Sequence, residues 1–80
     1  MNIHNVVDDI AEHIGLQNLS VSLGKKSQIN KISVHLLSLS TQDKKINTLI
    51  THEEIIGLLK GELTGFLKSR VELSLRSLMV

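Results

Sequence analysis

The chain has 80 residues, a formal net charge of +1, 41% hydrophobic residues and 21% charged residues, a balance that excludes an intrinsically disordered chain. A chain of this length can enclose one hydrophobic core, so we expect residues 1–80 to form a single domain. The absence of cysteine excludes disulfides and thiolate metal sites, and the low net charge with a single aromatic residue, Phe66, disfavours nucleic-acid binding.

Residues 3–14 have the clearest helical pattern in the chain. Apolar residues recur there at helical spacing and would form one stripe: Ile3, Val6, Val7, Ile10, Ala11 and Ile14. Asn2 is a suitable N-cap, and Gly15 is a suitable C-terminal stop because glycine adopts a left-handed backbone without strain. The pattern therefore predicts a helix over residues 3–14.

The period of the apolar residues then changes to two, which predicts β-strands. Leu19, Val21 and Leu23 alternate with serines, and the next four residues, 24–27, have the composition of a turn. A longer strand is predicted over residues 32–39. Its alternation slips at Leu36 and Leu37, which indicates either a bulge or a strand buried on both faces. Residues 40–45 form a polar connection, and residues 46–50 predict a short third strand.

A second helix is predicted to begin after Thr51. Thr51 and Glu54 have the spacing of a capping box, and Ile50 and Ile55 that of a hydrophobic staple. The buried stripe of this helix would contain Ile55, Ile56, Leu59, Leu63, Phe66 and Leu67. Residues 69–80 fit either a helix with a shifted contact face or a strand, and we favour the helix. The predicted fold is α+β with the order α-β-β-β-α: a three-stranded antiparallel sheet packed against an N-terminal helix and a longer C-terminal helix.

Three glycines are spaced four residues apart within this second predicted helix: Gly57, Gly61 and Gly65. Each glycine costs about 1 kcal/mol relative to alanine in a helix interior. The spacing would align them on one ridge, where a second helix could approach closely, and so predicts self-association as a homodimer. A row that faces solvent, or that packs under another segment of the same chain, explains the spacing equally well.

The chain has no residue pattern typical of catalysis, of a metal site or of a cofactor site. The four histidines, at positions 4, 13, 35 and 52, share no metal-ligand spacing, and Ile56 stands where a zinc-protease helix needs its second histidine. Neither a nucleophile elbow nor a phosphate-binding glycine loop occurs. We therefore expect a protein that is not an enzyme and that has no catalytic, metal-binding or cofactor-binding residues.

Two segments resemble class I type III secretion chaperones, which are small cytosolic homodimers that keep an exported protein partly unfolded. Residues 6–24, VVDDIAEHIGLQNLSVSLG, are similar to their opening helix and first strand, and residues 67–79, LKSRVELSLRSLM, to their closing helix. The chain is shorter than these chaperones and has no room for their later strands. The resemblance implies an apolar groove for an extended segment of a partner protein, lined by Val6, Val7, Ile10, Ile14, Leu19 and Val21.

The order of elements also resembles double-stranded-RNA-binding domains. Those domains contact phosphates through a lysine-rich start of the second helix, whereas this chain has the sequence His52-Glu53-Glu54 there. In an RNA-binding alternative, the phosphate contacts would come from Lys25, Lys26, Lys44 and Lys45.

The sequence thus favours a non-enzymatic adaptor, chaperone or small regulator that binds another protein through apolar contacts as a homodimer. We expect it to be cytoplasmic, because the acidic N-terminal segment lacks the apolar run of a signal peptide. We expect no membrane partner either, because the most apolar stretch, residues 55–67, is interrupted by Lys60 and Glu62. RNA retention that weakens with salt would favour the RNA-binding alternative.

Overall fold

The computed structural model describes residues 2–80, which form three helices and four strands. In chain order the elements are α1 (Ile3–Ile14), β1 (Ser20–Leu23), β2 (Ser27–Ile29), β3 (Ile32–Ser40), β4 (Lys45–Thr51), α2 (His52–Leu59) and α3 (Gly65–Leu78). The predicted α+β class with an antiparallel sheet is confirmed. The observed order adds one short strand, β2, and divides the predicted C-terminal helix into α2 and α3.

Helix α1 begins and ends where the sequence predicts. The side chain of Asn2 accepts a hydrogen bond from the Asn5 backbone N–H at 2.9 Å. Gly15 has a φ of 83°, and its N–H and that of Leu16 donate to the carbonyls of Glu12 and Ala11. Both ends of α1 are therefore closed by local hydrogen bonds.

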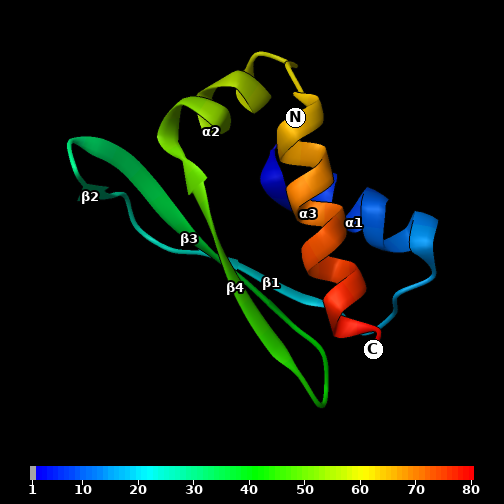
Figure 1. Ribbon diagram of the computed structural model, residues 1–80. Coiled ribbons are helices and arrows are strands. Elements are labelled where there is room, and N and C mark those ends of the chain that lie inside the picture. The colour runs from blue at the N-terminus through cyan, green and yellow to red at the C-terminus, as the bar shows by residue number, and fades with distance from the viewer. Residues whose placement is uncertain (1) are drawn as a thin grey trace.

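Strand β3 is the centre of the sheet (Figure 1). It pairs antiparallel with β4 along one edge, and with both β1 and β2 along the other. Leu23 lies opposite Leu37 and Ser27 lies opposite Val34, so the three residues 24–26 face only two residues of β3. β1 and β2 are therefore one strand interrupted by a bulge of one extra residue.

The turn predicted over residues 24–27 is wrong, because the chain reverses later, at Asn30 and Lys31. Both residues have positive φ, 51° and 68°, as the two central residues of a type I′ hairpin turn require. The Gly24 N–H still donates to the Leu36 carbonyl at 2.8 Å, which keeps the bulged segment on β3. Lysine rarely adopts a positive φ, so the residue type at position 31 does not predict this turn.

The hydrophobic core lies between one face of the sheet and the helices. Figure 1 shows α1 and α3 packed side by side on that face. The strands contribute Leu37, Leu39 and Ile50, each 1% exposed or less. The helices contribute the remaining members of the core cluster: Ile3, Val6, Val7, Ile10, Ala11, Leu58, Leu67, Val71, Leu75 and Leu78.

The capping box at the start of α2 is confirmed. The Glu54 N–H donates to Thr51 Oγ1 at 3.2 Å, and the Thr51 N–H donates to the Glu54 carboxylate at 3.0 Å. The uninterrupted helix predicted beyond it is wrong. Gly61, with a φ of 84°, donates to Leu58 O, and Glu62 donates to Gly57 O, which together form a Schellman stop.

Helix α3 starts anew after Thr64, whose Oγ1 accepts a hydrogen bond from the Leu67 N–H at 3.2 Å. Residues 69–78 continue as helix, which confirms the favoured alternative for this segment. The buried face consists of Leu67, Val71, Leu75 and Leu78. Phe66, predicted to be buried, is instead 85% exposed, because the restart at Gly65 turns it away from the core.

Candidate functional site

Within the part of the chain that the structure describes, one face of the sheet has no helix packed on it and exposes a group of apolar side chains. Four large aliphatic side chains on this face are between 43% and 55% exposed: Ile29, Ile32, Leu36 and Leu49. Val34 lies among them and is buried, although it stands outside the core cluster. We call these five residues the open-face patch.

The strand register assembles the open-face patch. Ile29 pairs with Ile32 across the β2–β3 hairpin, and Leu36 pairs with Leu49 across β3 and β4. Residues directly opposite one another point to the same face of a sheet, so each pair stands side by side. Val34 lies between Ile32 and Leu36 on the same face of β3, because side chains alternate along a strand. The five side chains therefore form one continuous surface that spans three strands.

The rest of the open face is polar but almost uncharged. By register and alternation, its other outward residues are Ser20, Ser22, Ser27, Ser38, Ser40, Asn47, Thr51 and, opposite Ser40, Lys45. Lys45 is the single charged residue in this set and lies at the end of β3 away from the patch. The paired strand positions of this face therefore carry little charge, and the bulge residues Lys25 and Lys26 border it beside Leu36.

A sequence signal for the open-face patch existed at Leu36 and Leu37. The slip in alternation there predicts either a bulge or a strand that is buried on both faces. β3 is regular over residues 34–40, and the bulge lies in its partner strand. Leu37 is fully buried while Leu36 is 43% exposed. The slip therefore marks a strand that is apolar on both faces and covered on one.

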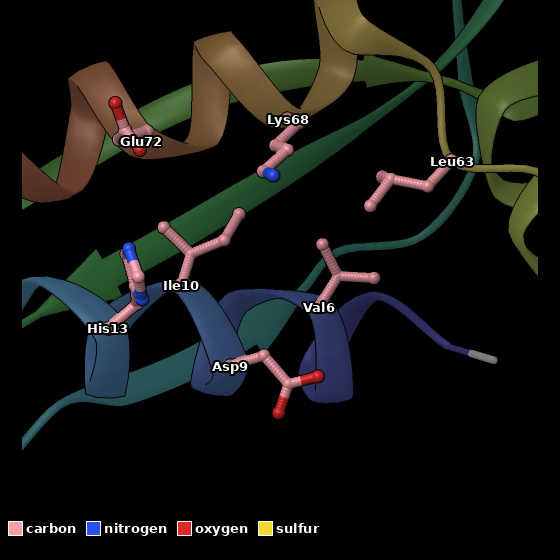
Figure 2. Close-up of a pocket in the computed structure, with 7 residues that line it drawn as sticks. All are labelled: Val6, Asp9, Ile10, His13, Leu63, Lys68 and Glu72. Atoms are coloured by element: carbon pink, nitrogen blue, oxygen red, sulfur yellow. The ribbon is translucent and has the colours of Figure 1, made fainter.

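A depression of about 380 Å³ lies between α1 and α3 (Figure 2). Figure 2 shows Val6 and Ile10 pointing toward α3, with Lys68 pointing toward them. The remaining lining residues are Asp9, His13, Leu63 and Glu72. An apolar floor with charged residues of both signs around it suits a segment of protein better than a uniformly charged ligand.

The six residues predicted to line a partner groove do not come together in an open groove. Val7 is fully buried, and Val6 and Ile10 are about as buried, at 4% and 6% exposure. The other three are partly buried and pack against the core: Ile14, Leu19 and Val21. Only Val6 and Ile10 reach the depression between α1 and α3. The apolar stripe of α1 fills the protein's own core, which corrects the predicted groove.

The three glycines predicted to align on one helix ridge lie in three different places. Gly57 is inside α2, Gly61 is in the connection after α2, and Gly65 is the first residue of α3. Gly61 is needed for its left-handed backbone, not for a close helix approach. The predicted ridge therefore does not form, and self-association must use another surface if it occurs.

A charged pair closes part of the free edge of β4. The Glu54 carboxylate pairs with the Arg70 guanidinium, whose Nη1 also donates to the Leu49 carbonyl at 3.2 Å. Burial raises the pKa of Glu54, but the hydrogen bonds from Arg70 and Thr51 and the positive charge of Arg70 outweigh this and lower it. Glu54 therefore links the start of α2 to α3 and to the edge of the sheet.

The lysines of the RNA-binding alternative do not form one patch. Lys25 and Lys26 lie in the bulge opposite His35, whereas Lys45 lies opposite Ser40 at the end of β3. Five residues along a strand separate the two groups by about 17 Å. Such dispersed charges do not follow a phosphate backbone, so the structure offers no observation that favours RNA.

Comparison with protein-family models, curated proteins and solved structures finds no match for this chain. Within residues 2–80, no three or more histidine, aspartate or glutamate side chains are grouped so that they could hold a metal ion. None of the helices in the same range has both the length and the apolar character needed to cross a membrane. The open-face patch and the α1–α3 depression are two apolar surfaces formed by these residues.

Proposed function

We propose that this protein is a non-enzymatic, cytoplasmic protein-binding module that works as a homodimer, with the open-face patch as the contact between the two copies. The observation that supports this is the exposure of four large aliphatic side chains on one continuous sheet face. Contiguous apolar patches of this kind on small domains mark sites of protein contact. Burying these side chains against a second apolar surface would remove them from water at about 25 cal/mol per Å².

A second copy of the chain fits this face. A twofold axis through the patch would set each patch against itself, which is the arrangement of most homodimers. The paired outward residues around the patch are serine, threonine and asparagine, and the nearest lysines, Lys25, Lys26 and Lys31, lie at its margin in the bulge and the β2–β3 turn. Lys45 lies at the far end of the face, where it does not oppose its counterpart near the axis.

Dimerisation through the open face would leave the other side of each copy free. The depression between α1 and α3 lies on that side, with Val6, Ile10 and Leu63 as its apolar part. A partner segment with an apolar side chain flanked by charged residues matches this lining. The adaptor, chaperone or regulator role would use this second surface.

Sedimentation velocity of the wild type and two lysine variants, at several protein concentrations, tests the homodimer. Leu36→Lys places a charge within the patch, where two copies would repel each other. Leu73→Lys is the matched control, because Leu73 is an exposed leucine on α3, away from the sheet. We expect the wild type and Leu73→Lys to sediment as dimers and Leu36→Lys as a folded monomer, with circular dichroism confirming the fold.

Two results would contradict the proposal. A wild type that stays monomeric at every concentration removes the homodimer. A Leu36→Lys variant that dimerises as strongly as the wild type places the contact on another surface.

A further inference from the structure

Two histidines from different elements meet where β3 and α2 come together. His35 lies in the middle of β3 opposite Ile50, and His52 is the first residue of α2, two residues after Ile50. His35 Nε2 is 3.0 Å from His52 Nδ1, and His35 Nδ1 is 3.0 Å from the Gly24 carbonyl oxygen. The ring centroids are 5.3 Å apart and the ring planes are inclined by 27°, so the two imidazoles are close to parallel. Three segments of the chain are thus joined through two imidazoles.

The number of protons that this arrangement accepts follows from its hydrogen bonds. A carbonyl oxygen only accepts, so His35 Nδ1 must carry a hydrogen. When both rings are neutral, His35 Nε2 is then an acceptor and His52 Nδ1 donates to it. One added proton is tolerated: on His52 Nε2 it leaves the bond unchanged, and on His35 Nε2 it reverses the donor once the His52 hydrogen has moved from Nδ1 to Nε2. A second added proton leaves two N–H groups facing each other without an acceptor.

We propose that His35 and His52 form a pH-sensitive latch that holds the start of α2 on β3 while the pair carries at most one added proton, and opens when it takes up a second. The second proton would place two positive charges at hydrogen-bond distance. It would do so at the N-terminus of a helix, where the backbone N–H groups already disfavour a cation. The first turn of α2 then separates from β3.

The charged groups around the latch do not neutralise a second proton. They are Lys25 and Lys26 beside Gly24, Lys31 in the β2–β3 turn, and Glu53 and Glu54 in the first turn of α2. Glu54 is already bound to Arg70 and to Thr51, which leaves Glu53 as the available carboxylate. Lys31 and Glu53 line the same depression as His52 and are both exposed, so their effects are opposite in sign and screened by solvent.

The pH dependence has a definite sign. The open form accepts two added protons and the latched form one, so the open form binds more protons at low pH and the latched form loses stability as the pH falls. Histidine titrates between about pH 5 and about pH 8, which sets the window. Opening would loosen α2, which contributes Leu58 to the core, while α1 and the rest of the sheet stay packed.

Hydrogen exchange of the α2 amides tests the latch. The rates are expressed as protection factors, so that the intrinsic pH dependence of exchange cancels. In the wild type, we expect protection over residues 55–59 to fall at least about tenfold between about pH 7 and about pH 5, as for loss of one charge-assisted hydrogen bond. His52→Gln keeps amide hydrogen bonding without a titrating group, so its protection should not change with pH. His4→Gln removes an exposed histidine of α1 and should behave as the wild type.

Nitrogen-15 NMR of the imidazole rings keeps the proposal testable if His52→Gln does not fold. In the wild type, the ring-nitrogen signals of His35 and His52 should change together as the pH falls, because one hydrogen bond joins the two rings. The latch is wrong if the signals of these two rings change independently of each other, or if α2 protection is unchanged when both nitrogens of each ring carry a hydrogen. It is also wrong if His52→Gln loses protection with pH as the wild type does.

Discussion

Leu36 and Leu37 are neighbours of the same residue type, yet they lie in different environments on the two faces of β3. Leu37 is fully buried beneath the helices, whereas Leu36 is 43% exposed on the open face. The covered face is closed by residues from α1, α2 and α3, and the open face has no such cover. Both sides of β3 are therefore apolar, and the helices within residues 2–80 pack on one of them.

The largest expected effect is a difference in stability between variants on the two faces of β3. Leu37→Ala should lower the free energy of unfolding by about 2–5 kcal/mol, because it opens a cavity in the core, while Leu36→Ala should cost under about 1 kcal/mol. Urea denaturation of both variants at low protein concentration provides the measurement. If Leu37→Ala does not fold, circular dichroism should show it unfolded and Leu36→Ala folded. That result ranks the two losses of stability in the same order. Equal losses would mean that the two faces are equally covered.

A smaller loss of stability is expected at Gly61, where the chain changes direction between α2 and α3. Gly61→Ala should cost about 1–2 kcal/mol, because alanine is strained in the left-handed backbone that ends α2. Gly65→Ala is the matched control, since nothing lies within 4 Å of the position of its added Cβ and its φ is not left-handed. Thermal unfolding of both variants compares them. A Gly61→Ala protein as stable as Gly65→Ala would argue for a continuous helix after all.

The Glu54–Arg70 pair should affect how the free energy of unfolding depends on pH in the acid range. The pKa of Glu54 is lowered in the folded protein, so its carboxylate stabilises the fold above its ordinary value near 4.5 and this stability is lost as the pH falls below it. Glu54→Gln should therefore cost about 1 kcal/mol near neutral pH, a modest figure because Arg70 is partly exposed, and should flatten the acid limb. Glu53→Gln, which alters an exposed neighbour, should leave both unchanged. Denaturation midpoints from about pH 7 to about pH 3 distinguish the two variants.

The smallest change in monomer stability is expected on the open face itself. Leu49→Thr should alter the free energy of unfolding by no more than about 0.5 kcal/mol, because threonine suits an exposed strand position. The same variant should weaken the proposed homodimer, since Leu49 pairs with Leu36 in the open-face patch. Sedimentation equilibrium beside denaturation at low concentration measures the two effects separately. A large loss of monomer stability would show that Leu49 is part of a covered surface.

Local signals let the sequence predict several elements correctly. Asn2 and Gly15 mark the ends of α1, and Thr51 with Glu54 marks the start of α2, because each acts within one helical turn. Gly61 carried an equally local signal for the end of α2. Its spacing from Gly57 and Gly65 suggested an aligned ridge instead, and the predicted self-association residues followed from that interpretation.

The open-face patch and the histidine latch could not be predicted residue by residue, because both depend on strand register. The pairing of Ile29 with Ile32 follows from the chain reversal at Asn30 and Lys31, and the pairing of Leu36 with Leu49 follows from the β3–β4 turn at residues 41–44. Locating the first of these turns too early removes β2 and the neighbours that β2 provides for β3. Lysine is rarely found at positive φ, so Lys31 does not indicate the true position of the turn.

The contact between Arg70 and Leu49 limits how copies of this protein can add to one another. Antiparallel pairing turns the backbone groups of Leu49 and Thr51 toward the outer edge of β4, where Arg70 occupies the carbonyl of one and Glu54 the amide of the other. An incoming strand would have to displace both side chains before it could form its own ladder there. Open-ended growth into fibrils is thereby opposed at this end of β4, whereas the proposed stacking of two open faces would end after two copies.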